Sequence, residues 1–184
     1  VGAPGHPVTG AALFAWGCGA ALALRTPLEE ALPGPVTLLA GFLAFDMLHE
    51  CGHMTANCAC GCPVEEIGLL LEPDMAFYVR NDSGPIVSAR GRRQYLQICL
   101  AGIETDLAAI GVLLWSCART GSRTCAFFAL FNMISVVHNA LPVSGRDGEK
   151  ALSALLHVED VDALAQAVLA SPARRRALVR RGIR

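Results

Sequence analysis

A five-residue motif, His49-Glu50-Cys51-Gly52-His53, carries the residue types of a metal-dependent hydrolase in the pattern H-E-x-x-H. On a helix, side chains four residues apart project from one face, so His49 and His53 can bind the same metal ion. A zinc ion held in this way lowers the pKa of a bound water towards neutrality. Glu50 then lies beside that water and can accept its proton as a general base. The motif therefore predicts two zinc ligands and one catalytic carboxylate.

Two further roles at such a site depend on carboxylates elsewhere in the chain. Asp46 precedes His49 by three residues and lies on the same helical face. It either orients one of the two histidines or occupies a water-filled cavity without a catalytic role. A tetrahedral catalytic zinc also needs a third protein ligand. The residues alone leave several candidates for it, namely Glu104, Asp106, His138, Asp147 and the cysteines.

The elements that position these residues are strongly apolar. Hydrophobic residues make up 53% of the 184 residues and charged residues 17%, against roughly 25% in an average soluble domain. The composition excludes a disordered chain, and the absence of a large basic field argues against a nucleic-acid partner. Four apolar stretches predict membrane-spanning helices at residues 9–24, 35–57, 94–118 and 124–141. The first is the shortest, and its alternatives are a signal-type apolar region or a buried helix.

The basic residues predict the orientation of these helices in a membrane. If all four stretches span, 12 of the 15 lysines and arginines lie on the side of the 58–93 loop and the C-terminal tail. Cytoplasmic segments carry an excess of lysine and arginine. We therefore expect an integral protein of a bacterial-type cytoplasmic membrane, with the lipid bilayer as a partner and the metal motif towards the cytoplasm.

The segments between and after the apolar stretches have patterns of their own. Residues 63–79 contain two short apolar runs separated by Glu72-Pro73-Asp74, which predicts a β-hairpin. Residues 149–169 have the apolar spacing of an amphipathic surface helix. The last fifteen residues carry six arginines, which either contact anionic lipid or form a solubilising tail.

These observations predict a mainly α, polytopic membrane helix bundle with a short β-hairpin after the metal-motif helix. Three helices form the core, and one N-terminal helix is added to it. The expected parts are an N-terminal tail and helix at 1–34, a membrane-embedded core at 35–148, and an amphipathic helix with a basic tail at 149–184.

The order of the motifs resembles the site-2 protease family of intramembrane zinc metalloproteases. HECGH ends one apolar stretch, and two stretches later the chain has Asn139-x-x-Pro142 followed by Asp147-Gly148. The sequence CPVEEIG from Cys62 is similar to the strand after the family's first motif. The sequence QICLAG, ending at Gly102, is similar to the family's next helix. The spacing of apolar residues after Asp147 resembles the branch called peptide zinc metalloproteases, and the resemblance covers roughly residues 36–158.

The resemblance implies roles for residues outside the H-E-x-x-H motif. It makes Asp147 the third ligand of one Zn²⁺ per chain, and it makes Asn139 a contact for the substrate or its oxyanion. Asp106 stands where the family often has an asparagine, which makes it a further candidate for substrate contact. The alternative for Asp106 is a buried polar contact between helices. The expected substrate is a peptide or membrane protein that binds as an extended strand on the hairpin.

Several functions remain compatible with the sequence. Only 36 residues separate the second and third apolar stretches, which leaves no room for an inserted domain and favours hydrolysis of a small precursor peptide. The alternatives are release of a membrane-anchored regulator, a non-proteolytic zinc-binding membrane protein, and a soluble zinc protease. The thiols of Cys58, Cys60 and Cys62 either bind a second, soft metal or fill a tight turn.

Overall fold

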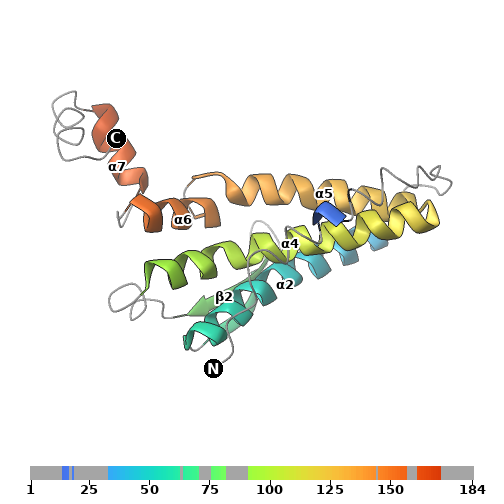
Figure 1. The fold of residues 1–184 in the computed structure, drawn as a ribbon, viewed down its shortest axis with the longest axis horizontal. Helices are drawn as coiled ribbons and strands as arrows, with labels where there is room; N and C mark the ends of the chain where they lie inside the picture. The colour runs from blue at the N-terminus through green and yellow to red at the C-terminus, as the bar shows by residue number, and fades with distance from the viewer. Residues whose placement is uncertain are drawn as a thin grey trace.

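The chain is mainly helical and carries one small two-stranded antiparallel sheet, as the sequence predicts. The computed structural model describes residues 14–16, 18, 33–62, 64–70, 76–81, 91–143, 145–156 and 161–170. Three long helices lie side by side along the molecule: α2 (Pro35–Cys60), α4 (Arg92–Thr120) and α5 (Arg123–Ala140) (Figure 1). Their bounds lie within a few residues of the second, third and fourth predicted helices.

Local signals set the ends of these helices. Proline occupies the first turn of α2, where its missing N–H is not needed for a helical hydrogen bond. Gly61 and Gly121 end α2 and α4 with φ angles of 79° and 70°, in the left-handed region that favours glycine. The hydroxyl of Ser122 accepts a hydrogen bond from the N–H of Cys125 and caps α5. Two residues therefore suffice to reverse the chain between α4 and α5.

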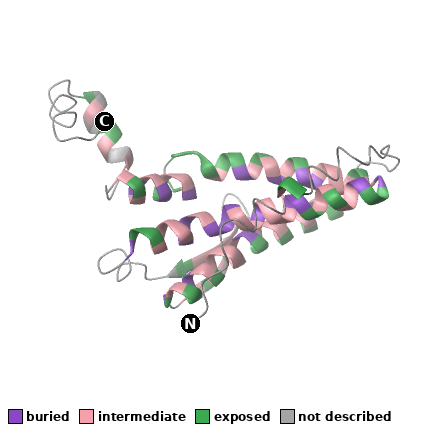
Figure 2. Cartoon of the chain, viewed as in Figure 1, coloured by how far each residue is buried: buried purple, intermediate pink, exposed green. Residues whose placement is uncertain are grey.

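The central helix is α4, which packs against both α2 and α5. Its Ile103 and Ile110 form a buried apolar cluster with Ala129 and Val136 of α5. Buried residues are concentrated along α4, whereas α5 exposes much of its surface (Figure 2). Helix α4 therefore contacts both of the other long helices.

The predicted hairpin forms directly after α2. Strands β1 (Val64–Leu70) and β2 (Ala76–Asn81) pair antiparallel, with Gly68 opposite Tyr78. The predicted turn residues between them lie outside the described residues. Both strands contact α2, and β2 makes most of these contacts, so the hairpin lies beside the metal motif.

The region after Asp147 contains two described helices where the sequence analysis predicts one. Helix α6 (Asp147–Leu156) packs against α4 and α5, and α7 (Val161–Ala170) follows it towards the C-terminal end (Figure 1). Helix α6 buries Ala151 and Ser153 against the core and exposes Leu155, which agrees with the predicted amphipathic pattern. The basic tail beyond residue 170 lies outside the described residues.

One described helix, α4, is long and apolar enough to cross a membrane. The polar motif residues of α2 interrupt its apolar sequence. Of the first predicted membrane helix, only residues 14–16 and 18 are described, and Trp16 stacks on Trp115 of α4 with ring centroids 5.5 Å apart. The remainder of that stretch lies outside the described residues.

Candidate metal centre

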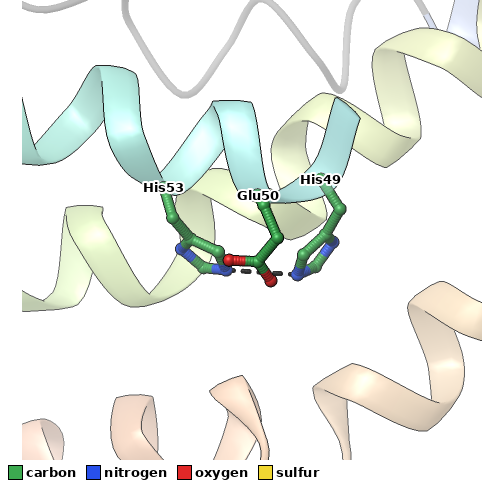
Figure 3. A group of neighbouring side chains, drawn as sticks. All are labelled: His49, Glu50 and His53. Carbon is green, nitrogen blue, oxygen red and sulfur yellow. Dashed lines mark hydrogen bonds between the residues drawn. The ribbon is translucent and has the colours of Figure 1, made fainter. Parts of the chain in front are cut away.

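The two histidines of the motif meet on one side of α2, as their spacing predicts. The side chains of His49, Glu50 and His53 project from the same side of the helix (Figure 3). The Nε2 atoms of the two imidazoles are 3.1 Å apart. One potential ligand atom from each of the three residues lies within 4.8 Å of the others, so this group could hold a metal ion.

Asp147 completes this group from the start of α6. Its Oδ2 lies 3.0 Å from Nε2 of His49 and 3.1 Å from Nε2 of His53. Gly148 follows it, and a side chain at that position would collide with the C-terminal end of α5 at Ala140. The absence of a side chain there lets α6 begin close to α5, which brings Asp147 to the histidines.

The Nδ1 atoms of both imidazoles have hydrogen-bond acceptors on α4. Nδ1 of His53 donates to the carbonyl oxygen of Ile98 at 2.7 Å, and a carbonyl can only accept. Nδ1 of His49 lies 2.7 Å from Oδ2 of Asp106, a residue only 2% exposed. With a proton on each Nδ1, a neutral imidazole presents an unprotonated Nε2 to the centre of the group.

Three electron-pair donors therefore converge on one point. Tetrahedral zinc with ligand distances of about 2.0–2.1 Å separates its ligand atoms by about 3.3 Å. The observed separations between the two Nε2 atoms and Oδ2 are 3.0 to 3.1 Å. Two imidazoles and one carboxylate are donors that divalent zinc accepts, and they leave a fourth position open. The residues present could thus hold a metal ion, and their donor atoms fit zinc.

The close approach of the rings to α4 depends on a glycine. A Cβ atom at Gly102 would collide with both imidazole rings. One turn away, a Cβ at Gly52 of α2 would lie 2.7 Å from the carbonyl oxygen of Ala101 and would also collide with Thr105. Two glycines therefore let the backbones of α2 and α4 approach closely at the metal-ligand face.

Asp147 keeps its negative charge in a mostly buried position. Burial raises the pKa of its carboxyl group, but hydrogen bonds that His49 and His53 donate when their Nε2 atoms carry a proton outweigh this and hold the pKa well below the usual range. Binding of a metal ion would displace those protons. The ammonium group of Lys150 adds to the effect, with Nζ 3.6 Å from Oδ1. The carboxylate therefore directs Oδ2 to the imidazoles and Oδ1 to a cation.

Two carboxylates of α2 contact the hairpin. Oε2 of Glu50 accepts a hydrogen bond of 3.0 Å from the N–H of Val79, and Oδ2 of Asp46 accepts one from the N–H of Phe77. Because Phe77 and Val79 are two residues apart, both N–H groups point from the same edge of β2. The hairpin therefore fixes the predicted general base beside the histidines.

The structure places two acidic residues in line with the alternatives that the sequence left open for them. Asp106, the candidate for substrate contact, is the carboxylate that orients a histidine. Asp46, for which the sequence left open either orientation of a histidine or a place in a cavity, contacts the hairpin and lines a cavity. The physical reason is the neighbour of each residue, because α4 packs against the histidines while β2 packs against the preceding turn of α2.

The remaining candidates are placed as follows. His138 contacts Arg146, with Nη1 of Arg146 2.7 Å from Nδ1 of His138. The same Nη1 lies 3.5 Å from Oδ1 of Asn139, and Asn139 lines the cavity next to His49. Among the described residues, the three motif side chains form the one such metal-binding group, so no second site gathers at the thiols of Cys58, Cys60 and Cys62.

Among the described residues, two cavities are lined by members of the group formed by His49, Glu50, His53 and Asp147. The larger, of about 590 Å³, lies between α2 and α5 and is lined by His49 and Asp106 as well as by apolar side chains. The smaller, of about 170 Å³, is lined by Glu50, His53 and Asp147. Residues of the group thus line both cavities.

Sequence reasoning missed the contacts that come from backbone atoms and from neighbouring helices. The carbonyl of Ile98 and the N–H of Val79 are backbone groups, so the residue type does not predict these contacts. Lys150 follows Asp147 by three residues, a spacing from which an ion pair on a helix could have been predicted. Comparison with known protein families, curated proteins and solved structures returns no match to this chain.

Proposed function

We propose that the chain is a membrane-embedded zinc metalloendopeptidase. One observation carries the proposal: Nε2 of His49, Nε2 of His53 and Oδ2 of Asp147 converge within 3.1 Å of one another, with Glu50 beside them. This donor set is that of a catalytic zinc site with an open position. The resemblance of the sequence motifs to site-2 proteases agrees with it.

The chemistry divides between the ion and the chain. When bound, zinc would lower the pKa of water and polarise a peptide carbonyl. Glu50 accepts the proton of the attacking water as the new C–O bond forms, and it gives that proton to the amine as the C–N bond breaks. Asn139 would donate an amide hydrogen to the carbonyl oxygen, since its Oδ1 is directed to Arg146.

Exposed apolar side chains support a membrane location. On α5, Leu130, Ile134 and Val137 are 64%, 59% and 57% exposed and share one face of the helix. A contiguous apolar face of this kind is unfavourable in water but favourable in lipid. The candidate span α4 lies beside it, so α2, α4 and α5 would cross the cytoplasmic membrane together with the metal motif towards the cytoplasm.

The substrate would be a small precursor peptide or a membrane-anchored regulator that enters the site in an extended conformation. The N–H groups of Phe77 and Val79, on the edge of β2 that faces α2, now donate to Asp46 and Glu50. A substrate strand paired with this edge would offer its own carbonyl groups as acceptors in place of the two carboxylates. That exchange would release the carboxylate of Glu50 to act on water. The hairpin would therefore couple substrate binding to activation of the general base.

The decisive comparison is between the native chain and Glu50→Gln. Peptides from membranes and medium of cells producing each form are compared by mass spectrometry, and the zinc content of each purified protein is measured. We expect the native chain to generate peptides that Glu50→Gln does not, with at least a hundredfold loss of cleavage and equal zinc content. Glu65→Gln, an exposed hairpin residue, is the matched control.

A second function competes with this one. The carboxylate of Glu50 already accepts a hydrogen bond from Val79, which would suit a zinc-binding protein in which Glu50 has a structural role. In that case both forms would contain zinc and yield the same peptides. A chain that contains no metal in either form would contradict both functions.

A further inference from the structure

The larger cavity has an apolar part and a polar part. Leu39, Phe42, Leu43 and Phe45 of α2 and Phe131 of α5 supply apolar walls. Towards the metal-ligand group, the lining changes to Asp46, His49, Asp106, Asn132, Ser135 and Asn139. A volume of about 590 Å³ falls within the roughly 300–1,000 Å³ of typical ligand pockets. The cavity thus runs from an apolar space between two helices to a metal ligand.

One buried amide in this cavity has no partner among the described residues. Asn132 is only 2% exposed, and its Nδ2 donor makes no hydrogen bond with any of them. A buried donor without an acceptor is costly, so such a group is expected to have a ligand partner. Asn132, Ser135 and Asn139 follow the i, i+3, i+7 spacing of one helical face, which places three polar side chains along the same wall.

We infer that this cavity binds an apolar side chain of the peptide substrate and that Asn132 determines how the substrate is held. The side chain occupies the part lined by leucine and phenylalanine, while Nδ2 of Asn132 donates to a backbone carbonyl of the same segment. The inference rests on the proposed peptidase function and adds a substrate preference to it. Asn132 is a binding residue in this account and takes no part in proton transfer.

The lining favours a peptide over a lipid chain as the occupant. An acyl chain would match the apolar walls but would leave the donor of Asn132 and the polar face of α5 without acceptors. An extended peptide supplies both an apolar side chain and a carbonyl every residue. Continuity of the cavity with His49 then places a neighbouring peptide bond of the same segment near the metal ligands.

Three small hydroxamates test this inference without measuring hydrolysis. Acetyl-leucine hydroxamate carries the side chain and the acyl carbonyl, acetyl-glycine hydroxamate lacks the side chain, and 4-methylpentanoic hydroxamate lacks the acyl carbonyl. Their Kd values for the detergent-solubilised, zinc-loaded chain are measured by calorimetry. The native chain should bind acetyl-leucine hydroxamate at least about tenfold more tightly than the glycine compound, because burial of a leucine side chain is favourable.

Substitution of Asn132 should weaken the binding only of hydroxamates that carry the acyl carbonyl. Asn132→Leu is expected to weaken acetyl-leucine hydroxamate about fivefold and to leave 4-methylpentanoic hydroxamate unchanged. Asn57→Leu is the matched control, since Asn57 is equally buried, also has an unpartnered amide oxygen among the described residues, and lines the smaller cavity. It should leave the ratios of all three Kd values unchanged.

A second variant keeps the test independent of the folding of Asn132→Leu. Leu39→Trp narrows the apolar end of the cavity at a residue that is 48% exposed, and it should abolish the preference for leucine over glycine. An equal affinity of the native chain for the leucine and glycine compounds would overturn the inference while leaving the peptidase proposal intact. A purified chain that takes up no zinc, and therefore binds none of the three hydroxamates, would instead contradict the proposed function.

Discussion

The two sides of α2 are built differently. On the side of α4, Gly52 and Gly102 allow the two helices to approach closely. Asp106 and the carbonyl group of Ile98 contact the Nδ1 atoms of His49 and His53. On the side of α5, a cavity of about 590 Å³ lies between the helices, which also contact each other through Phe42 and Phe131. One side therefore fixes the two histidines of the proposed metal site, and the other contains the cavity proposed for the substrate.

This difference separates two properties that substitutions should affect independently. Changes on the α4 side alter the position and basicity of the imidazoles, so they should act on metal affinity. Changes on the α5 side alter the shape and polarity of the cavity, so they should act on substrate affinity. A variant on either side that changes the wrong property would contradict the division.

The largest effect on the α4 side is expected from Asp106→Asn. The neutral amide can still accept a hydrogen bond from His49 but no longer offers a negative charge, so zinc affinity should fall about 10–100-fold. Competition with a chromophoric chelator measures the affinity. Asp46→Asn, one turn before the motif and bonded to Phe77, serves as the control and should change it less. Equal losses would show that general charge, rather than contact with the histidine, sets the affinity.

A smaller effect is expected from Gly102→Ala. The added methyl group collides with the rings of His49 and His53, and overpacking by one group typically costs about 1–3 kcal/mol. We expect a zinc affinity about tenfold weaker and a lower Tm in detergent. Gly34→Ala has open space around it and should leave zinc affinity unchanged, with only a small decrease in Tm because Gly34 is the N-cap of α2. An unchanged affinity for Gly102→Ala would mean that the rings do not approach α4 as closely as described.

The smallest effect on the metal is expected from Ser135→Ala on the α5 side. Ser135 lines the cavity but is separate from the converging ligand atoms, so zinc affinity should stay within about twofold of the native value. The same chelator competition applies, with KM for any peptide that the native chain cleaves as the second readout. A large loss of zinc affinity in this variant would show that the α4 side and the α5 side do not act independently.

The sequence predicts the elements well because their signals are local. Apolar length, the Pro35 start and the turn signal of the hairpin reproduce α2, α4, α5, β1 and β2. The i, i+4 spacing of His49 and His53 also predicts their convergence, which depends on helical geometry alone. Asp147 required the resemblance of the motifs, since no local rule brings residues 49 and 147 together.

The parts that could not be predicted depend on neighbours distant in sequence. Spacing places Asp46 and His49 on one face but does not say that β2 lies against the first and α4 against the second. The contact of His53 with Ile98 uses a backbone oxygen, which any residue type would offer. The buried, unpartnered amide of Asn132 likewise emerges only from the packing of α5.

X-ray absorption spectroscopy of the zinc-loaded protein tests the central claim most directly. We predict a first shell of nitrogen and oxygen alone at about 2.0–2.2 Å, with the scattering pattern of two imidazoles, and loss of one oxygen ligand in Asp147→Ala. A sulfur shell at about 2.3 Å would contradict the account, because it would assign the metal to the cysteines instead of His49, His53 and Asp147.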